Sequence, residues 1–278
     1  VDFSRIRAFH MDEYVGLPEG APQSFGQYLR EHIFDRAHFM EVNYINGRAE
    51  DIDAECARYA ALLKKYPPDI VMMGIGENGH IAFNDPAEAD LSDPLAVKRV
   101  ALDDVCRMQQ VHDGCFEKID DVPKYAVTLT VPTLTSALTQ ICVVPAPTKA
   151  NAVKETVCGP IGSHCPATAL RPRGIHMSIG HSDALYEQVL PAYEAGFDCV
   201  THLYSGMSTV RRINAFRYSG IVEAAYLLDG LTVELIADGC HLPASLLKLA
   251  YKIKGPERIM LITDGISAAG MENVQGEI

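Results

Sequence analysis

Residues that could move protons gather in the segment GIGENGHIAFNDP. There, His80 lies between the amide of Asn78 and the carboxylate of Asp85. A carboxylate that orients and charges an imidazole can make a general acid or base near neutral pH. Asp12, in the earlier segment MDEYVGL, is predicted at the end of a strand, where open α/β sheets bind ligands. A solvated loop would also explain Asp12, whereas the longer block around His80 favours a proton-transfer site.

Four further residues follow short β-branched runs, in positions typical of metal chemistry. His181 stands in GIHMSIGHSDA and His202 in VTHLYSGMS, and imidazoles at the ends of neighbouring strands can share zinc or iron. ADGCHL adds His241 and LITDGISAAG adds Asp264. A strand-end aspartate that faces a metal-bound water can act as a general base. Each residue alone fits a packing or capping role, but the series favours a metal site.

Alternating strand and helix patterns would hold these residues in place. Short apolar runs predict strands at 69–74, 125–131, 140–144, 175–179, 199–202, 232–237 and 258–263. Helical spacing over 52–66 is one of the intervening segments. The order predicts an α/β protein: an open, Rossmann-like, mostly parallel sheet with helices on both faces, followed by a partial (β/α) TIM-barrel segment. Asp12 and His80 should lie near the carboxyl ends of strands, and His181 beside His202.

The composition excludes several classes of protein. With 278 residues, 48% of them hydrophobic and 22% charged, the chain can bury a core and is not wholly disordered. The net charge is −12, with an acidic excess on both sides of Pro172, so we expect no nucleic-acid or membrane partner. No apolar run is long enough to span a membrane and no leader opens the chain, so we expect a cytoplasmic protein. The 8 cysteines form no CxxC pair, which predicts reduced thiols.

Four segments together resemble one enzyme family. MDEYVGL, GIGENGHIAFNDP, VPKYAVTLT and PAPTKANAVKETV, in that order and spacing, are similar to the glucosamine-6-phosphate deaminase family over residues 1–171. The resemblance implies that His80 opens the sugar ring, assisted by Asn78 and Asp85. It implies that Asp12 then moves a proton between C2 and C1, giving an enolamine that loses ammonia. This chemistry implies no cofactor for that part of the chain.

The same resemblance implies how the sugar phosphate is held. This sequence departs from the family's pattern at two points. Lys149 matches the family's phosphate-binding lysine, at the start of a predicted helix. Arg107 is the candidate for its phosphate-binding arginine. Asp85 stands where better-known members have Glu, a side chain longer by one methylene. The family's first strand and its Gly/Ser/Thr-rich phosphate loop have no counterpart in this sequence.

A second resemblance covers residues 173–278. GIHMSIGHSDA, VTHLYSGMS, ADGCHL and LITDGISAAG resemble the N-acetylglucosamine-6-phosphate deacetylase family, whose members are metal-dependent amidohydrolase-type TIM barrels. The resemblance implies that His181 and His202 hold a divalent metal, zinc or iron, and that Asp264 is the catalytic acid/base. It also implies contacts with the substrate through Ser205, Gly206, Arg217 and His241. The family's metal-binding Glu, the first half of the barrel and its last strands have no counterpart here.

The two resemblances share one class of substrate, an amino-sugar phosphate. We therefore expect a hydrolase of amino-sugar phosphate catabolism that converts glucosamine 6-phosphate to fructose 6-phosphate and ammonia. Three alternatives stay open: a metal-dependent N-acetylglucosamine-6-phosphate deacetylase, a bifunctional fusion of the two enzymes, and a catalytically impaired fragment that only binds sugar phosphate. The expected partner is the small-molecule substrate, and a homo-oligomer is compatible with the sequence.

Overall fold

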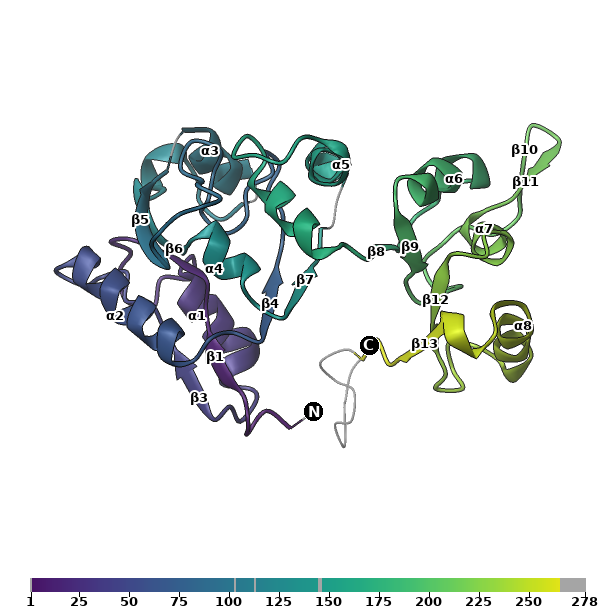
Figure 1. Ribbon diagram of the computed structural model, residues 1–278, viewed down its shortest axis with the longest axis horizontal. Coiled ribbons are helices and arrows are strands. Elements are labelled where there is room, and N and C mark those ends of the chain that lie inside the picture. Colours follow the sequence, from purple (N-terminus) through teal and green to yellow (C-terminus); the bar gives the residue numbers. More distant parts are fainter. Residues whose placement is uncertain (1, 103, 113, 145–146, 266–278) are drawn as a thin grey trace. The chain divides into compact units, whose positions relative to one another are not determined.

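The computed structural model describes residues 2–102, 104–112, 114–144 and 147–265. The chain divides between Gly174 and Ile175 into two compact units, the N-terminal unit and the C-terminal unit (Figure 1). In the described residues, no helix combines the length and the apolar character that crossing a bilayer requires. Several cysteines carry free thiols, as their spacing predicted: Cys56, Cys142, Cys158, Cys165, Cys199 and Cys240.

The N-terminal unit alternates short strands with helices. Its strands are β1 (Arg7–Phe9), β2 (Asp12–Tyr14), β3 (Glu41–Asn43), β4 (Ile70–Met73), β5 (Val97–Ala101), β6 (Tyr125–Leu129) and β7 (Thr139–Cys142). Its α-helices are α1 (Phe25–Leu29), α2 (Ile52–Lys65), α3 (Asp104–His112), α4 (Val131–Thr135) and α5 (Ala150–Cys158). Short π and 3₁₀ segments are η1 (Arg30–Phe34), η2 (Ile119–Asp121), η3 (Pro147–Lys149) and η4 (Pro166–Arg173).

Strand pairing in this unit is of two kinds. β1 pairs with β3 and β4 with β7, both in parallel, which confirms the α/β class predicted from the sequence. β2, β6 and β5 form an antiparallel sheet, a feature that the sequence did not indicate. An apolar run shows that a strand is buried but not which way it pairs. This antiparallel sheet is what brings β2, with Asp12, alongside β6.

The long helix α2 follows directly from its sequence. Asp51 caps it, because its carboxylate accepts a hydrogen bond from the Ala54 N–H at 2.9 Å. Its buried face repeats at helical spacing through Cys56, Tyr59 and Leu63. The helix spans almost the whole segment over which the periodicity predicted one.

Tyr14, at the end of β2, lies at the centre of the N-terminal core. Its ring packs on Phe25, Phe83 and Phe116, with centroids 5.3, 5.1 and 5.6 Å away. Its side chain is fully buried and its hydroxyl donates to the Gln110 side-chain oxygen of α3 at 2.8 Å. The aromatic cluster therefore holds β2, α1, the loop after β4 and the segment after α3 together, and the Gln110 hydrogen bond adds α3 itself.

The C-terminal unit is a parallel sheet covered by helices. Its strands are β8 (Met177–Ile179), β9 (Phe197–Val200), β10 (Arg211–Ile213), β11 (Phe216–Tyr218), β12 (Thr232–Ile236) and β13 (Ile259–Ile262). Its helices are α6 (Tyr186–Glu194), α7 (Ile221–Leu227), α8 (Ala244–Lys254) and the 3₁₀ turn η5 (Pro256–Arg258). The parallel order is β13-β12-β9-β8, while β10 and β11 form a separate antiparallel hairpin.

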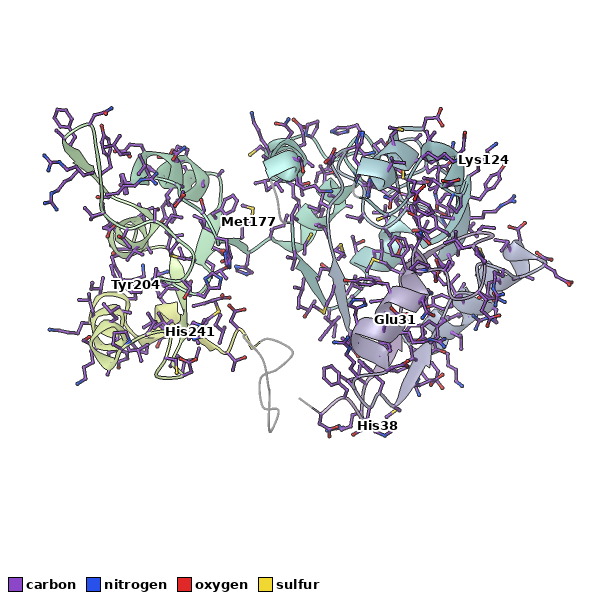
Figure 2. The ribbon with its side chains drawn as sticks, turned by 180° about the vertical axis from the view of Figure 1, so that it is seen from behind. Glu31, His38, Lys124, Met177, Tyr204 and His241 are labelled. Carbon is purple, nitrogen blue, oxygen red and sulfur yellow. The ribbon has the colours of Figure 1, made fainter. Side chains whose placement is uncertain are left out.

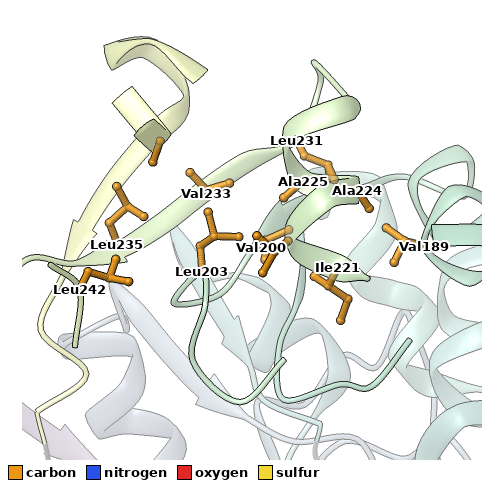
Figure 3. Packing of buried hydrophobic residues seen from close by; sticks show 12 residues of the cluster. Val189, Val200, Leu203, Ile221, Ala224, Ala225, Leu231, Val233, Leu235 and Leu242 are labelled. Carbon is orange, nitrogen blue, oxygen red and sulfur yellow. The ribbon is translucent and has the colours of Figure 1, made fainter. Parts of the chain in front are cut away.

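This unit has a hydrophobic core of its own. Val200, Leu203 and Val233 pack against Ile221 and Ala225 of α7 (Figure 3). The parallel strands follow one another in the sheet in an order that fits strand–helix units of a barrel segment. Each loop after β8, β9, β12 and β13 therefore leaves the same edge of the sheet.

Candidate active site

The loop after β4 brings His80, Asn78 and Asp85 into contact. His80 Nδ1 shares a hydrogen bond with Asn78 Oδ1 at 2.8 Å and lies 3.2 Å from Asp85 Oδ1. Asn78 Nδ2 donates to the same Asp85 oxygen at 2.9 Å. Both groups beside Nδ1 are acceptors, so this nitrogen carries the proton and Nε2 is the atom left for proton exchange. The sequence predicted this group of three, and its members do lie together.

Asp85 is held as a carboxylate although it is almost completely buried. Its side chain is 2% exposed, and burial alone would raise its pKa. The hydrogen bond and the charge of His80, together with the Asn78 amide, outweigh that effect and hold the pKa of Asp85 below its usual range. The Asp85 side chain reaches His80, with its Oδ1 3.2 Å from Nδ1, although it is one methylene shorter than Glu.

Glycines allow the loop to fold tightly around the imidazole. A Cβ on Gly76 would lie 2.1 Å from His80 Cε1. Gly79 has a positive φ of 84°, and a Cβ there would lie 2.4 Å from the sulfur of Cys165. The Gly79 carbonyl accepts a hydrogen bond from the Ala167 N–H at 2.9 Å. The loop thus rests on the segment around Cys165.

The two adjacent acids of β2 differ in their surroundings. Glu13 is buried, and its carboxylate accepts hydrogen bonds from Ser24 Oγ at 2.7 Å and from the Gly26 N–H at 2.9 Å. It therefore fixes the start of α1, a role that the sequence analysis missed. Burial, and then the neighbouring charge of Glu13, raise the pKa of Asp12 to about 7. Asp12 is the acid of this pair that can take up and release a proton near neutral pH.

Lys149 and Arg107 lie in different environments. Lys149 ends η3 and stands at the N-cap of α5, in the position that the sequence predicted for a phosphate-binding lysine. Arg107 is buried, and its guanidinium donates to the Ile119 carbonyl at 2.6 Å and to Asp104 Oδ1 at 3.1 Å. The suggestion that Arg107 binds phosphate does not fit, because these contacts occupy its guanidinium.

His181 and His202 lie side by side in the C-terminal unit, as the sequence predicted. They follow the paired strands β8 and β9, and their ring centroids are 4.7 Å apart. Both have positive φ angles, 41° and 31°, which turns the chain sharply at each strand end. His202 is buried, and its Nδ1 has no hydrogen-bond partner among the described residues.

The other predicted residues of this unit are distributed along the same sheet edge and the hairpin. The Ser205 N–H donates to the His202 carbonyl at 2.9 Å, and a Cβ on Gly206 would lie 2.7 Å from His181 Nδ1. The exposed His241 follows β12 and shares a hydrogen bond with Asp238 Oδ2 at 2.7 Å (Figure 2). The two remaining predicted residues are exposed: Arg217 on β11 and Asp264 after β13.

The described residues of the C-terminal unit do not complete a metal centre. Catalytic zinc sites normally use three protein ligands and leave one position open. Within residues 2–102, 104–112, 114–144 and 147–265, no three His, Cys, Asp or Glu side chains come together in this way. Among the described residues, two adjacent imidazoles are therefore present without a third ligand.

Comparison with known proteins defines the class. Residues 1–179 match the family of glucosamine-6-phosphate isomerases/6-phosphogluconolactonase. The chain belongs to this family. The matched residues include Asp12, the His80 loop and Lys149.

Several individual relatives are glucosamine-6-phosphate deaminases. A glucosamine-6-phosphate deaminase of Listeria monocytogenes is 37% identical over 171 residues, which are 62% of this chain and 71% of that protein. The deaminase of Bacillus cereus is also 37% identical and covers 62% of this chain and 63% of its own length. A monomeric glucosamine-6-phosphate deaminase of known structure has a TM-score of 0.56 and 32% identity, over 62% of this chain and 70% of that one.

A further solved structure matches a smaller part of the chain. An N-acetylglucosamine-6-phosphate deacetylase of Thermotoga maritima is 40% identical over 37% of this chain and 27% of its own. The TM-score of 0.34 is too low to establish a fold by comparison.

Proposed function

We propose that the N-terminal unit converts glucosamine 6-phosphate to fructose 6-phosphate and ammonia. The observation that carries the proposal is the contact of His80 with Asn78 and Asp85, in a unit whose Asp12 has a pKa of about 7. A base needs a pKa near the working pH, and an imidazole needs a fixed tautomer. Relatives that are glucosamine-6-phosphate deaminases support the choice of substrate.

His80 would open the sugar ring. Asp85 and Asn78 keep its proton on Nδ1, so Nε2 can remove the proton from the C1 hydroxyl. The bond between C1 and the ring oxygen then breaks, C1 becomes an aldehyde, and the ring oxygen takes up a proton to become the C5 hydroxyl. Asp85 stabilises the imidazolium that forms in between.

Asp12 would carry out the isomerisation. Its carboxylate removes the C2 proton, and the electron pair forms the C1=C2 bond of an enolamine while the C1 oxygen is protonated. Asp12 returns its proton to C1, and C2 becomes an iminium carbon. Water then adds to C2 and ammonia leaves, so that the reaction as a whole consumes one water. None of these steps uses a cofactor.

The substrate phosphate would bind at Lys149. This lysine stands at the N-terminus of α5, where backbone N–H groups and the helix dipole favour an anion. Its ammonium adds a point charge, so its removal should weaken binding more than it slows the proton transfers.

Release of ammonia from glucosamine 6-phosphate tests the proposal. We expect turnover that is insensitive to chelators, with fructose 6-phosphate formed in equal amount. The competing outcome is a folded protein whose melting temperature rises with the sugar phosphate while no ammonia appears. That result would leave a sugar-phosphate-binding protein without catalysis.

For the C-terminal unit we propose an N-acetylglucosamine-6-phosphate deacetylase-like segment with a weak divalent-metal site. The 4.7 Å separation of the His181 and His202 rings favours it, and the lack of a third ligand in the part of the chain that the structure describes argues for low affinity. Purified protein should hold well below one zinc or iron per chain, less still in His181→Ala, and deacetylate at background rates. One metal per chain retained through dialysis would contradict this proposal.

A further inference from the structure

Strand β6 contacts both parts of the proposed catalytic site. On one side it pairs with β2, where Asp12 stands directly opposite Thr128. The Leu129 N–H donates to the Met11 carbonyl at 2.9 Å, which fixes this register next to Asp12. Residues opposite each other on antiparallel strands project to the same face, with Cβ atoms about 4.5–5.5 Å apart. The side chain of Thr128 is therefore a direct neighbour of Asp12.

β6 also holds the His80 loop. The Phe83 N–H donates to Thr128 Oγ1 at 3.2 Å. Asn84 Nδ2 donates to the Leu129 carbonyl at 2.8 Å and to the Ile81 carbonyl at 2.9 Å. The bonds from Phe83 and Asn84 to Thr128 and Leu129 attach this part of the loop, just before Asp85, to β6.

The side chains of Thr128 and Asn84 are fully buried. Thr128 and Asn84 are both 0% exposed. The Thr128 hydroxyl accepts from Phe83 and donates to the Leu129 carbonyl at 3.0 Å, so both its donor and its acceptor capacity are used. A buried polar group that loses its partner is destabilising, so moving the loop away from Thr128 would be unfavourable.

We infer that Thr128 and Asn84 are positioning residues that set the distance between Asp12 and the His80–Asp85 pair. The inference rests on the proposed deaminase function and adds two residues to it. One threonine side chain touches the loop of the ring-opening imidazole and stands opposite the proposed isomerisation base. A shift of the loop along β6 would move His80 away from Asp12, so the residues that carry out the two steps of the reaction would no longer share one site.

Thr130 provides a matched comparison on the same strand end. It is also 0% exposed, and its hydroxyl donates to the Leu95 carbonyl at 2.8 Å, away from the His80 loop. A Thr→Val change keeps the shape and removes the hydroxyl at either position. The two variants therefore remove similar buried hydrogen bonds, but only one of these bonds reaches the loop.

The experiment compares Thr128→Val, Thr128→Ser and Thr130→Val in the full chain. The readouts are kcat and KM for ammonia release, the melting temperature, and the NMR titration of the His80 ring. Misplacing reacting groups by about 1 Å can cost on the order of 100-fold in rate, so we expect Thr128→Val to lower kcat by about 10- to 100-fold. KM should change little, the His80 titration should shift, and Thr128→Ser should recover most of kcat. Thr130→Val should lose a similar amount of melting temperature with kcat and the titration unchanged.

Two results would overturn the inference. One is equal kcat in Thr128→Val and Thr130→Val, and the other is a His80 titration that Thr128→Val leaves in place. If the unaltered protein releases no ammonia, the proposed function fails. The NMR comparison then still decides whether Thr128 positions His80.

Discussion

At the scale of single residues, the structure assigns different work to neighbouring carboxylates. Glu13 is tied to Ser24 and to the first turn of α1, whereas Asp12 has a pKa raised to about 7 by burial and by the charge of Glu13. Glu13 fixes the start of α1, and Asp12 can exchange protons. The sequence MDEYVGL shows both acids, but it does not show which of them is hydrogen-bonded.

Conservative substitutions should separate these roles. Asp12→Asn should reduce ammonia release by at least about 100-fold, because positioned general bases contribute roughly 10²–10⁴-fold. Its melting temperature should not fall. Glu13→Gln places an amide NH₂ against backbone donors and should cost about 1–3 kcal/mol of unfolding free energy. The rate of ammonia release and chemical denaturation, measured for both variants, check these expectations. A strongly destabilised Asp12→Asn would contradict the assignment.

The raised pKa of Asp12 predicts a specific pH dependence. In the folded state Asp12 holds its proton up to a pH of about 7, whereas in the unfolded chain it loses it near 3.8. The folded state therefore binds more protons across that window, and this group makes folding less stable as the pH rises from about 4 to 7. Urea unfolding at several pH values should show that the unaltered protein loses stability relative to Asp12→Asn across this window. Parallel slopes in the two proteins would contradict the raised pKa.

At the scale of elements, the site depends on how the loop after β4 packs. Gly76 faces the His80 ring so closely that a Cβ would lie 2.1 Å from it, whereas a Cβ on Gly74 would meet only the Val143 carbonyl at 3.4 Å. Gly76→Ala should therefore displace the imidazole and lower kcat by at least about 10-fold, and Gly74→Ala should retain kcat. Steady-state kinetics of the two variants test this, and equal activity would show that the loop adapts.

Sequence patterns predicted elements better than their pairing. The helix over 52–66 and the strands near 69–74 and 232–237 appear close to their predicted limits, because periodicity and apolar runs are local. The antiparallel pairing of β2 with β6 was not predictable in this way, since it depends on contacts between distant segments. For the same reason the sequence showed His80, Asn78 and Asp85, which lie within one loop, but not Thr128, which reaches that loop from another strand.

At the scale of the whole molecule, the two units have separate hydrophobic cores. Ile221 is fully buried among residues of the C-terminal unit only. Ile221→Ala should destabilise that unit by about 2–5 kcal/mol through the cavity it leaves. Ammonia release at a temperature where the N-terminal unit stays folded should be unchanged. A parallel fall in kcat would show that the C-terminal unit supports the deaminase site.

In the proposed function, Asp12 and the His80 loop together deaminate an amino-sugar phosphate. The most direct measurement is the release of ammonia and fructose 6-phosphate from glucosamine 6-phosphate by the unaltered chain, with Asp12→Asn beside it. We predict equal amounts of the two products, no effect of chelators, and loss of both products in Asp12→Asn. Ammonia release that persists in Asp12→Asn, or a folded protein that binds the substrate without releasing ammonia, would contradict the account.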